Sequence, residues 1–137
     1  MDYDTYRKQF FTDPAPEQRF GFTGLHGLTL FFSDYAAAVD FYQQVLGPPS
    51  YFEGEFTRGW RIGATWLNLV KGKEGSPQNV EVMLVMDSPA GVDSLREAIL
   101  KAGGDAGQTA DQLMYEPVYS CSARDPFGTE IMIYCLR

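Results

Sequence analysis

The sequence contains few of the residues on which most enzyme chemistries depend. It has one histidine, His26, and two cysteines, Cys121 and Cys135, in 137 residues. A nucleophile–base pair would therefore need Cys121 or Ser120 beside His26, and no spacing in the sequence supports that pairing. No Gly-rich loop with a following lysine comes after a predicted strand, which argues against a phosphate-binding loop. Paired carboxylates for acid–base chemistry would have to be Glu81 with Glu130 or Glu116, again without support from the pattern.

Positive charge is also scarce, and long apolar runs are missing. There are 11 Lys and Arg against 18 Asp and Glu, a net charge of −7, and no basic cluster. This balance argues against nucleic acid and anionic membrane surfaces as partners. No apolar run has the length of a membrane span, and the first residues are charged, unlike a secretion signal. We therefore expect a cytoplasmic protein whose two cysteines, on neighbouring strands but not opposite each other, stay free thiols.

What is present indicates one globular domain with an N-terminal extension. Apolar residues make up 45% and aromatic residues 15% of the chain, enough for a hydrophobic core that needs no disulfide or structural metal. Residues 1–20 form the extension, and 21–137 form the domain. In the extension, Tyr3, Tyr6 and Phe10 share one side of a short helix. We expect it to pack on the outside of the domain; a lid or a dimer contact is the alternative.

Asp125-Pro126-Phe127-Gly128 predicts a tight turn. Asp125 can accept from the backbone ahead of it, Pro126 fixes φ at the second position, and Gly128 supplies a left-handed residue. The runs 118–123 and 129–136 on either side are strand-like, so they form a hairpin. Alternation then places Glu130, Met132 and Tyr134 on one face of the last strand and Ile131, Ile133 and Cys135 on the core face.

The rest of the chain repeats one order of elements, strand, helix and three strands. The first module covers about 24–72 and the second about 79–137, with a polar linker at 71–78. The expected strands are 24–32, 51–56, 59–62, 64–70, 80–86, one around 106–109, and the two of the hairpin. The predicted buried positions of the two helices are Val39, Tyr42, Val45 and Leu46, with Phe41 flanking, and Val92, Leu95, Ile99 and Ala102. Ser33 or Asp34 caps the first helix and Ser88 the second, with Pro89 at its first position. The fold class is α+β.

Two stretches resemble the vicinal oxygen chelate superfamily, which includes glyoxalase I, extradiol dioxygenases and bleomycin-resistance proteins. The first is the strand 28–33, Asp34, and a helix with Phe41-Tyr42 that ends at Leu46-Gly47; the second is the turn at 125–128. The resemblance runs from about Gly24 to the C-terminus. It implies two βαβββ modules that form a cup-shaped half-barrel sheet, with helices outside and a ligand inside the cup. It also suggests a homodimer.

The resemblance implies four inward positions that carry His, Glu or Gln in metal-dependent members. Here these positions hold Gly27, Asn68, Glu81 and Met132, and a one-residue slip of the third strand would put Val80 in place of Glu81. Only Glu81 is a usual ligand for a divalent cation. His26 and Glu130 are neighbours that could substitute only with a shifted register. We therefore predict no metal site and no cofactor, with His26, Glu81 and Glu130 as weak candidates for a divalent metal.

The predicted inward faces are rich in aromatic and methionine side chains and include a small polar patch, as small-molecule pockets do. The candidate ligand-binding residues are Phe31, Trp66, Asn68, Glu81, Met83, Met132 and Tyr134, with Trp60 and Tyr119 less securely placed. The favoured hypothesis is a small-molecule-binding protein of the glyoxalase/bleomycin-resistance type, with Glu81 as counter-charge to a cationic ligand. One alternative is a metal-dependent lyase, isomerase or dioxygenase of the same superfamily. The other is an accessory protein whose cup is filled by its own side chains.

Overall fold

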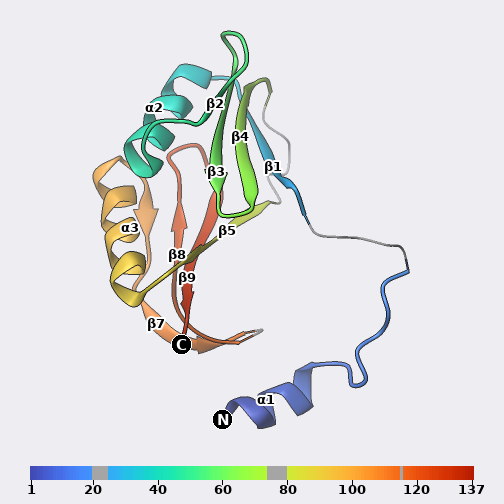
Figure 1. The fold of residues 1–137 in the computed structure, drawn as a ribbon. Helices are drawn as coiled ribbons and strands as arrows, with labels where there is room; N and C mark the ends of the chain where they lie inside the picture. The colour runs from blue at the N-terminus through green and yellow to red at the C-terminus, as the bar shows by residue number, and fades with distance from the viewer. Residues whose placement is uncertain (20–24, 74–79, 115) are drawn as a thin grey trace.

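The computed structural model describes residues 1–19, 25–73, 80–114 and 116–137, in which two sheets and three helices form (Figure 1). Sheet A has the order β1 (Gly27–Phe32), β4 (Thr65–Lys71), β3 (Thr57–Ile62), β2 (Tyr51–Phe52). Sheet B has the order β5 (Glu81–Met86), β9 (Glu130–Leu136), β8 (Pro117–Arg124), β6 (Asp105–Ala106), and β7 (Ala110–Leu113) also pairs with β8. The predicted α+β class and the predicted module order are confirmed.

The helices are α1 (Tyr3–Phe10), α2 (Tyr35–Leu46) and α3 (Pro89–Lys101). Asp34 caps α2 by accepting from the Ala37 backbone N–H at 3.2 Å, and Ser88 caps α3 by accepting from the Gly91 N–H at 3.0 Å. These contacts satisfy backbone donors that the first helical turn leaves unpaired. None of the helices in the described ranges is long and apolar enough to cross a membrane.

Strand register makes the internal repeat visible. In each module the first strand runs parallel to the last, with Gly27 opposite Trp66 in sheet A and Glu81 opposite Glu130 in sheet B. One pleat further, Asn68 lies opposite Thr29, and Met132 lies opposite Met83. The two modules therefore place equivalent residues at equivalent heights of their sheets.

The strand predicted around 106–109 was wrong in position. Two short strands take its place, β6 before residues 107–109 and β7 after them. Both pair with the edge of β8 that β9 does not occupy. Ala106 pairs with Ala123 and Ala110 with Ser120, so the three residues 107–109 face the two residues 121–122. One extra residue of this kind is a β-bulge, which interrupts the ladder where a single strand was expected.

One continuous core joins both modules. It lies between the helices and the helix-covered faces of the sheets, and its members include Leu30, Phe32, Leu67, Leu69, Val82, Leu84, Ile131 and Ile133. Val92, Leu95 and Ile99 of α3 are buried as predicted, with Ala102 packed beside them. Both cysteines are buried and free, and they face different residues: Cys121 pairs with Ile133 and Cys135 with Tyr119.

Helix α2 buries its predicted stripe in part: Tyr42 and the flanking Phe41 are buried, and Val39, Val45 and Leu46 pack against the core while partly exposed. The buried residues are Tyr35, Ala38, Phe41 and Tyr42, whereas Val39 is only half-buried. The reason is the second module: Phe127 of the 125–128 turn packs edge-on against Phe41, with ring centroids 6.4 Å apart. The apolar side of α2 therefore contacts both sheet A and this turn.

Candidate functional site

Each sheet has one face covered by α2 or α3 and one face that neither of these helices covers, which we call open; α1 lies near one end of the open face of sheet B. On sheet A, we call open the face that carries Thr29, Phe31, Tyr51, Arg61, Trp66, Asn68 and Val70. Trp66 lies edge-on to Tyr51 at a centroid distance of 6.2 Å, and the guanidinium of Arg61 sits 5.0 Å from the Trp66 ring. Phe31 is 50% exposed. This face is an aromatic platform with one stacked cation.

Asn68 is held close to Gly59 on the neighbouring strand of sheet A. A Cβ built on Gly59 would lie 2.6 Å from Asn68 Oδ1 and 3.2 Å from the Cβ of Tyr51. Glycine at position 59 therefore makes the room in which the Asn68 amide lies. Arg61 and Tyr51 were missed by the sequence analysis. The alternation Gly59–Arg61 along β3 was the signal for Arg61, because it places Arg61 on the face of Trp66.

The open face of sheet B carries Glu81, Met83 and Val85 on β5 and Glu130, Met132 and Tyr134 on β9, as the alternation predicted. Glu81 and Glu130 are register partners, so two carboxylates lie side by side. Arg124 follows on the other side of Glu130, and its Nε donates to Glu130 Oε1 at 2.9 Å. Two acids and one base leave this end of the face with an unpaired negative charge at Glu81.

Trp60 and Tyr119 do not belong to these open faces. Trp60 is buried on the helix-covered side of sheet A, where its indole N–H donates to the Gly47 carbonyl at 2.8 Å. Tyr119 faces α3, and its hydroxyl donates to Asp93 Oδ1 at 2.7 Å. Each residue sits one position away from open-face residues, because neighbouring positions of a strand point to opposite faces.

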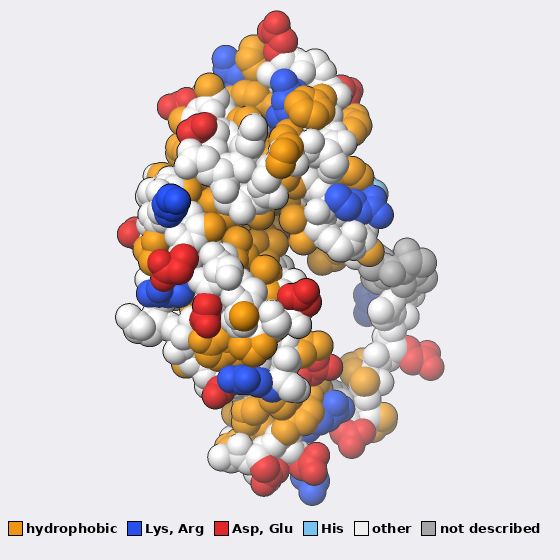
Figure 2. All heavy atoms as spheres, turned by 60° about the vertical axis from the view of Figure 1, so that its left-hand side comes forward, with side chains coloured by type: hydrophobic (Ala, Val, Ile, Leu, Met, Phe, Trp, Pro, Cys, Tyr) orange, Lys and Arg blue, Asp and Glu red, His pale blue; other side chains and the backbone are white. Residues whose placement is uncertain are grey.

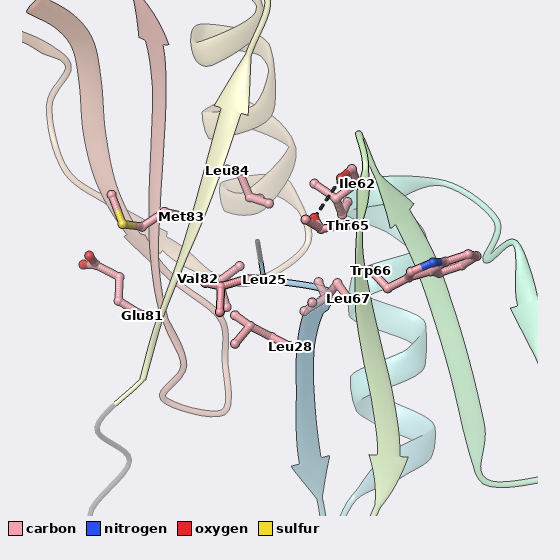
Figure 3. Close-up of a pocket in the computed structure, with 11 residues that line it drawn as sticks. Leu25, Leu28, Ile62, Thr65, Trp66, Leu67, Glu81, Val82, Met83 and Leu84 are labelled. Atoms are coloured by element: carbon pink, nitrogen blue, oxygen red, sulfur yellow. Dashed lines mark hydrogen bonds between the residues drawn. The ribbon is translucent and has the colours of Figure 1, made fainter. Parts of the chain in front are cut away.

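A crevice of about 280 Å³ separates the edges of the two sheets (Figure 3). The side chains that point into it are aliphatic: Leu25, Leu28, Ile62, Leu67, Val82 and Leu84. Its other polar side chain besides Glu81 is Thr65, whose hydroxyl donates to the Ile62 carbonyl at 2.8 Å. Glu81, Met83 and Trp66 also line it, but Figure 3 shows their side chains pointing away from it, Trp66 to one side and the other two to the opposite side. The crevice is an apolar junction, and the reactive side chains lie outside it.

The four positions that the superfamily resemblance assigns to metal ligands do not form a fitting donor set. A Cβ on Gly27 would lie 2.0 Å from the Trp66 carbonyl oxygen, so backbone fills the place of a ligand side chain. Met132 offers only a thioether, and Asn68 lies in the other sheet from Glu81. Across the described ranges, no three His, Cys, Asp or Glu side chains gather in a metal-binding group. Hard and borderline divalent cations need several oxygen or nitrogen donors.

The weak metal candidates are also separated or occupied. His26 is exposed just before β1, and its carbonyl accepts from the Trp66 N–H at 3.0 Å. Glu130 is engaged by Arg124. Of the weak set, only Glu81 and Glu130 are neighbours. Two carboxylates, one of them ion-paired, do not complete a metal centre.

Comparison with known proteins locates this arrangement among known families. The sequence model of the Glyoxalase/Bleomycin resistance protein/Dioxygenase superfamily matches residues 24–133. None of the curated proteins matches the sequence.

Solved structures share the same architecture. A glyoxalase/bleomycin resistance protein/dioxygenase family enzyme from Burkholderia phytofirmans PsJN is 21% identical, with a TM-score of 0.67 over 82% of this chain and 98% of that one. Lactoylglutathione lyase from Agrobacterium tumefaciens is 16% identical, with a TM-score of 0.62 over 85% and 96%. The fosfomycin resistance protein FosX from Mesorhizobium loti is 15% identical, with a TM-score of 0.65 over 85% and 94%. At these identities the likeness confirms the predicted fold.

Proposed function

Because the chain belongs to the Glyoxalase/Bleomycin resistance protein/Dioxygenase superfamily, we propose that it is a small-molecule-binding protein without the superfamily's full metal site. The observation that carries this proposal is the pair of open sheet faces, whose apolar side chains stay accessible. Phe31 is 50% and Met83 is 39% exposed, and they lie on β1 and β5, the edge strands of the two sheets. Grouped exposed apolar side chains with a few polar groups are typical of binding surfaces. The same exposure argues against a cup filled by its own side chains.

The charge of the open face of sheet B favours a cationic ligand. Glu81 has no ion-pair partner among the described residues, whereas its neighbour Glu130 is paired with Arg124. A cation beside Glu81 would restore neutrality, and the thioethers of Met83 and Met132 provide soft, adaptable walls. The face with α2 and α3, turned forward in Figure 2, mixes acidic and basic side chains among the atoms described there.

We also propose that the protein binds its ligand as a homodimer. In one chain, Trp66 of sheet A and Glu81 of sheet B point to opposite sides of the crevice (Figure 3), so the two open faces do not face each other. A second copy would allow the open face of sheet A in one chain to meet that of sheet B in the other. Sedimentation velocity should then find dimers at micromolar concentration; a chain that remains monomeric but binds ligand normally would contradict the dimer.

The test of the binding function is calorimetric titration with benzyltrimethylammonium as a cationic aromatic probe. We expect saturable binding to the wild type, and about tenfold weaker binding to Glu81→Gln, because a charge partner is lost. Glu55→Gln, which removes an exposed carboxylate from the turn before β3, is the matched control and should bind like the wild type. Equal binding by Glu81→Gln, or binding that requires an added metal, would overturn the proposal.

A further inference from the structure

A second cavity lies where the N-terminal helix meets sheet B. Its volume is about 300 Å³, and residues of the extension line one side of it: Tyr3, Arg7 and Phe11. The other side is the open face of sheet B, with Val118, Tyr134 and Leu136, and Met114 and Glu116 complete the lining. Figure 1 shows α1 near the end of the sheet at which β9 finishes. The extension lies outside residues 24–133, the range that the superfamily's sequence model matches.

Arg7 gives the cavity a cation of defined geometry. Its guanidinium carbon lies 4.6 Å from the Phe11 ring centroid and 5.9 Å from the Tyr3 ring centroid. No carboxylate of the described residues pairs with it, since the ion pairs found there involve Arg96, Arg124 and Arg137. A guanidinium supported by rings keeps its N–H edge available, and that edge matches a planar carboxylate.

An unsatisfied polar group lies in sheet B beside the cavity, although it is not part of the lining. Ser120 is 1% exposed, and its hydroxyl has no hydrogen-bond partner among the described residues. It lies directly opposite Tyr134 in the β8–β9 pair, so both side chains are on the same face of the sheet. A buried hydroxyl without a partner is unfavourable unless something else supplies one. The sheet side of the cavity therefore adjoins a buried hydroxyl, that of Ser120, without a hydrogen-bond partner among the described residues.

We propose that this cavity is a second binding site, which takes a small aromatic carboxylate. The carboxylate pairs with Arg7, and the ring lies among Tyr3, Phe11 and Tyr134. Aromatic walls suit a flat ring, and the volume is at the lower end of the range for small-molecule sites. Glu116, exposed at the rim, repels the carboxylate and so directs it toward Arg7. This site lies at the Tyr134 end of the open face of sheet B, whereas Glu81 lies at the other end of that face and does not line the cavity.

Calorimetric titration of the full chain with 2-naphthoate tests the proposal. We expect saturable binding to the wild type and at least about tenfold weaker binding to Arg7→Gln, which loses a charge-assisted hydrogen bond. Lys8→Gln is the matched control, because it removes the same charge from the next residue of α1, which does not line the cavity. It should bind within about twofold of the wild type. Equal loss in both variants would mean general electrostatic attraction and would overturn the site.

Two further measurements separate a binding role of Arg7 from a structural one. Tyr134→Leu leaves α1 untouched and removes the ring on the sheet side, so it too should weaken 2-naphthoate binding, and unchanged affinity would overturn the site. 2-Naphthylmethanol, which lacks the charge, should bind the wild type and Arg7→Gln equally weakly; wild-type binding as tight as that of 2-naphthoate would overturn the role of Arg7. Glu81→Gln should leave 2-naphthoate affinity unchanged, so this proposal and the proposed function can fail independently.

Discussion

The hydroxyl of Tyr42 donates a hydrogen bond of 2.7 Å to Asp125 Oδ2, and this contact ties the first helix of module one to the hairpin turn of module two. Asp125 is 2% exposed, and its other carboxylate oxygen accepts from the backbone N–H groups of Phe127 at 2.9 Å and Thr129 at 2.8 Å. Phe127 packs against Phe32 with ring centroids 5.3 Å apart. The turn at 125–128 is thus a structural joint, by which we mean that its Asp125 and Phe127 side chains hold the second module against the first.

Removing the Tyr42 hydroxyl should destabilise the whole domain. Tyr42→Phe should lower the free energy of unfolding by about 1.5–3 kcal/mol, because the lost hydrogen bond is made to a charged, buried acceptor. Urea denaturation at pH 7 measures the change. Tyr51→Phe is the control, since the Tyr51 hydroxyl also donates to a carboxylate, that of Glu53, but in an exposed position. A loss no larger for Tyr42→Phe than for Tyr51→Phe would contradict the role of the joint.

Alkaline pH should reveal the same contact. Burial, and then the negative charge of Asp125, raise the pKa of Tyr42 well above its ordinary value. Because the folded state keeps the proton while the unfolded chain releases it above about pH 10, rising pH favours unfolding. The stabilising contribution is therefore complete below about pH 10 and is lost progressively above it. Urea midpoints between pH 8 and 11 should fall more steeply for the wild type than for Tyr42→Phe; parallel curves would contradict this.

Gly27 should tolerate no side chain, although the family position it occupies often carries one. The backbone carbonyl of Trp66 fills the place of its Cβ at 2.0 Å, and backbone cannot move aside as a side chain can. Gly27→Ala should therefore destabilise the domain by about 1–3 kcal/mol. Gly91→Ala, in the first turn of α3, is the comparison and should be close to neutral, since its nearest contacts are the side-chain oxygens of Ser88 and Asp87, at 3.3 and 3.4 Å. Thermal unfolding of both variants decides the question, and an unaffected Gly27→Ala would show that β1 can take a ligand side chain there.

The two thiols should react slowly in the native protein. Burial raises the pKa of the Cys121 thiol, which lowers its reactive thiolate fraction, and Cys135 is only 1% exposed. Labelling with a thiol reagent at pH 8 should be slow for both residues in buffer and complete in urea. Rapid labelling of one equivalent without denaturant would mean that the β8–β9 region opens readily.

Local patterns in the sequence carry much of this fold. The Asp125 turn, the caps at Asp34 and Ser88, and the alternation along β9 each depend on nearby residues, and each was predictable. The stripe of α2 was predictable only in part, because its contact with Phe127 comes from the other end of the chain. The bulge at 107–109 was missed for a similar reason, since its register is set by β8 and not by its own residues.

The candidate sites divide in the same way. Alternation along single strands placed Glu81, Met83, Met132 and Tyr134 together on one open face. Nothing local in the sequence indicates that Trp66 points to the opposite side of the crevice from Glu81, because that depends on how the modules pack. The second cavity brings together Arg7 and Tyr134 from the two ends of the chain. No local sequence pattern predicts that these two residues lie near each other.

The measurement that tests the central claim most directly is the metal content of the untagged protein. The chain is exposed to Ni²⁺, Zn²⁺, Mn²⁺ and Fe²⁺, dialysed, and analysed for bound elements, in parallel with Glu81→Gln. A small-molecule-binding protein without the superfamily's metal site should retain no stoichiometric metal in either form. About one ion per chain in the wild type, lost in Glu81→Gln, would contradict the account and direct the search toward metal-dependent lyase, isomerase and dioxygenase reactions.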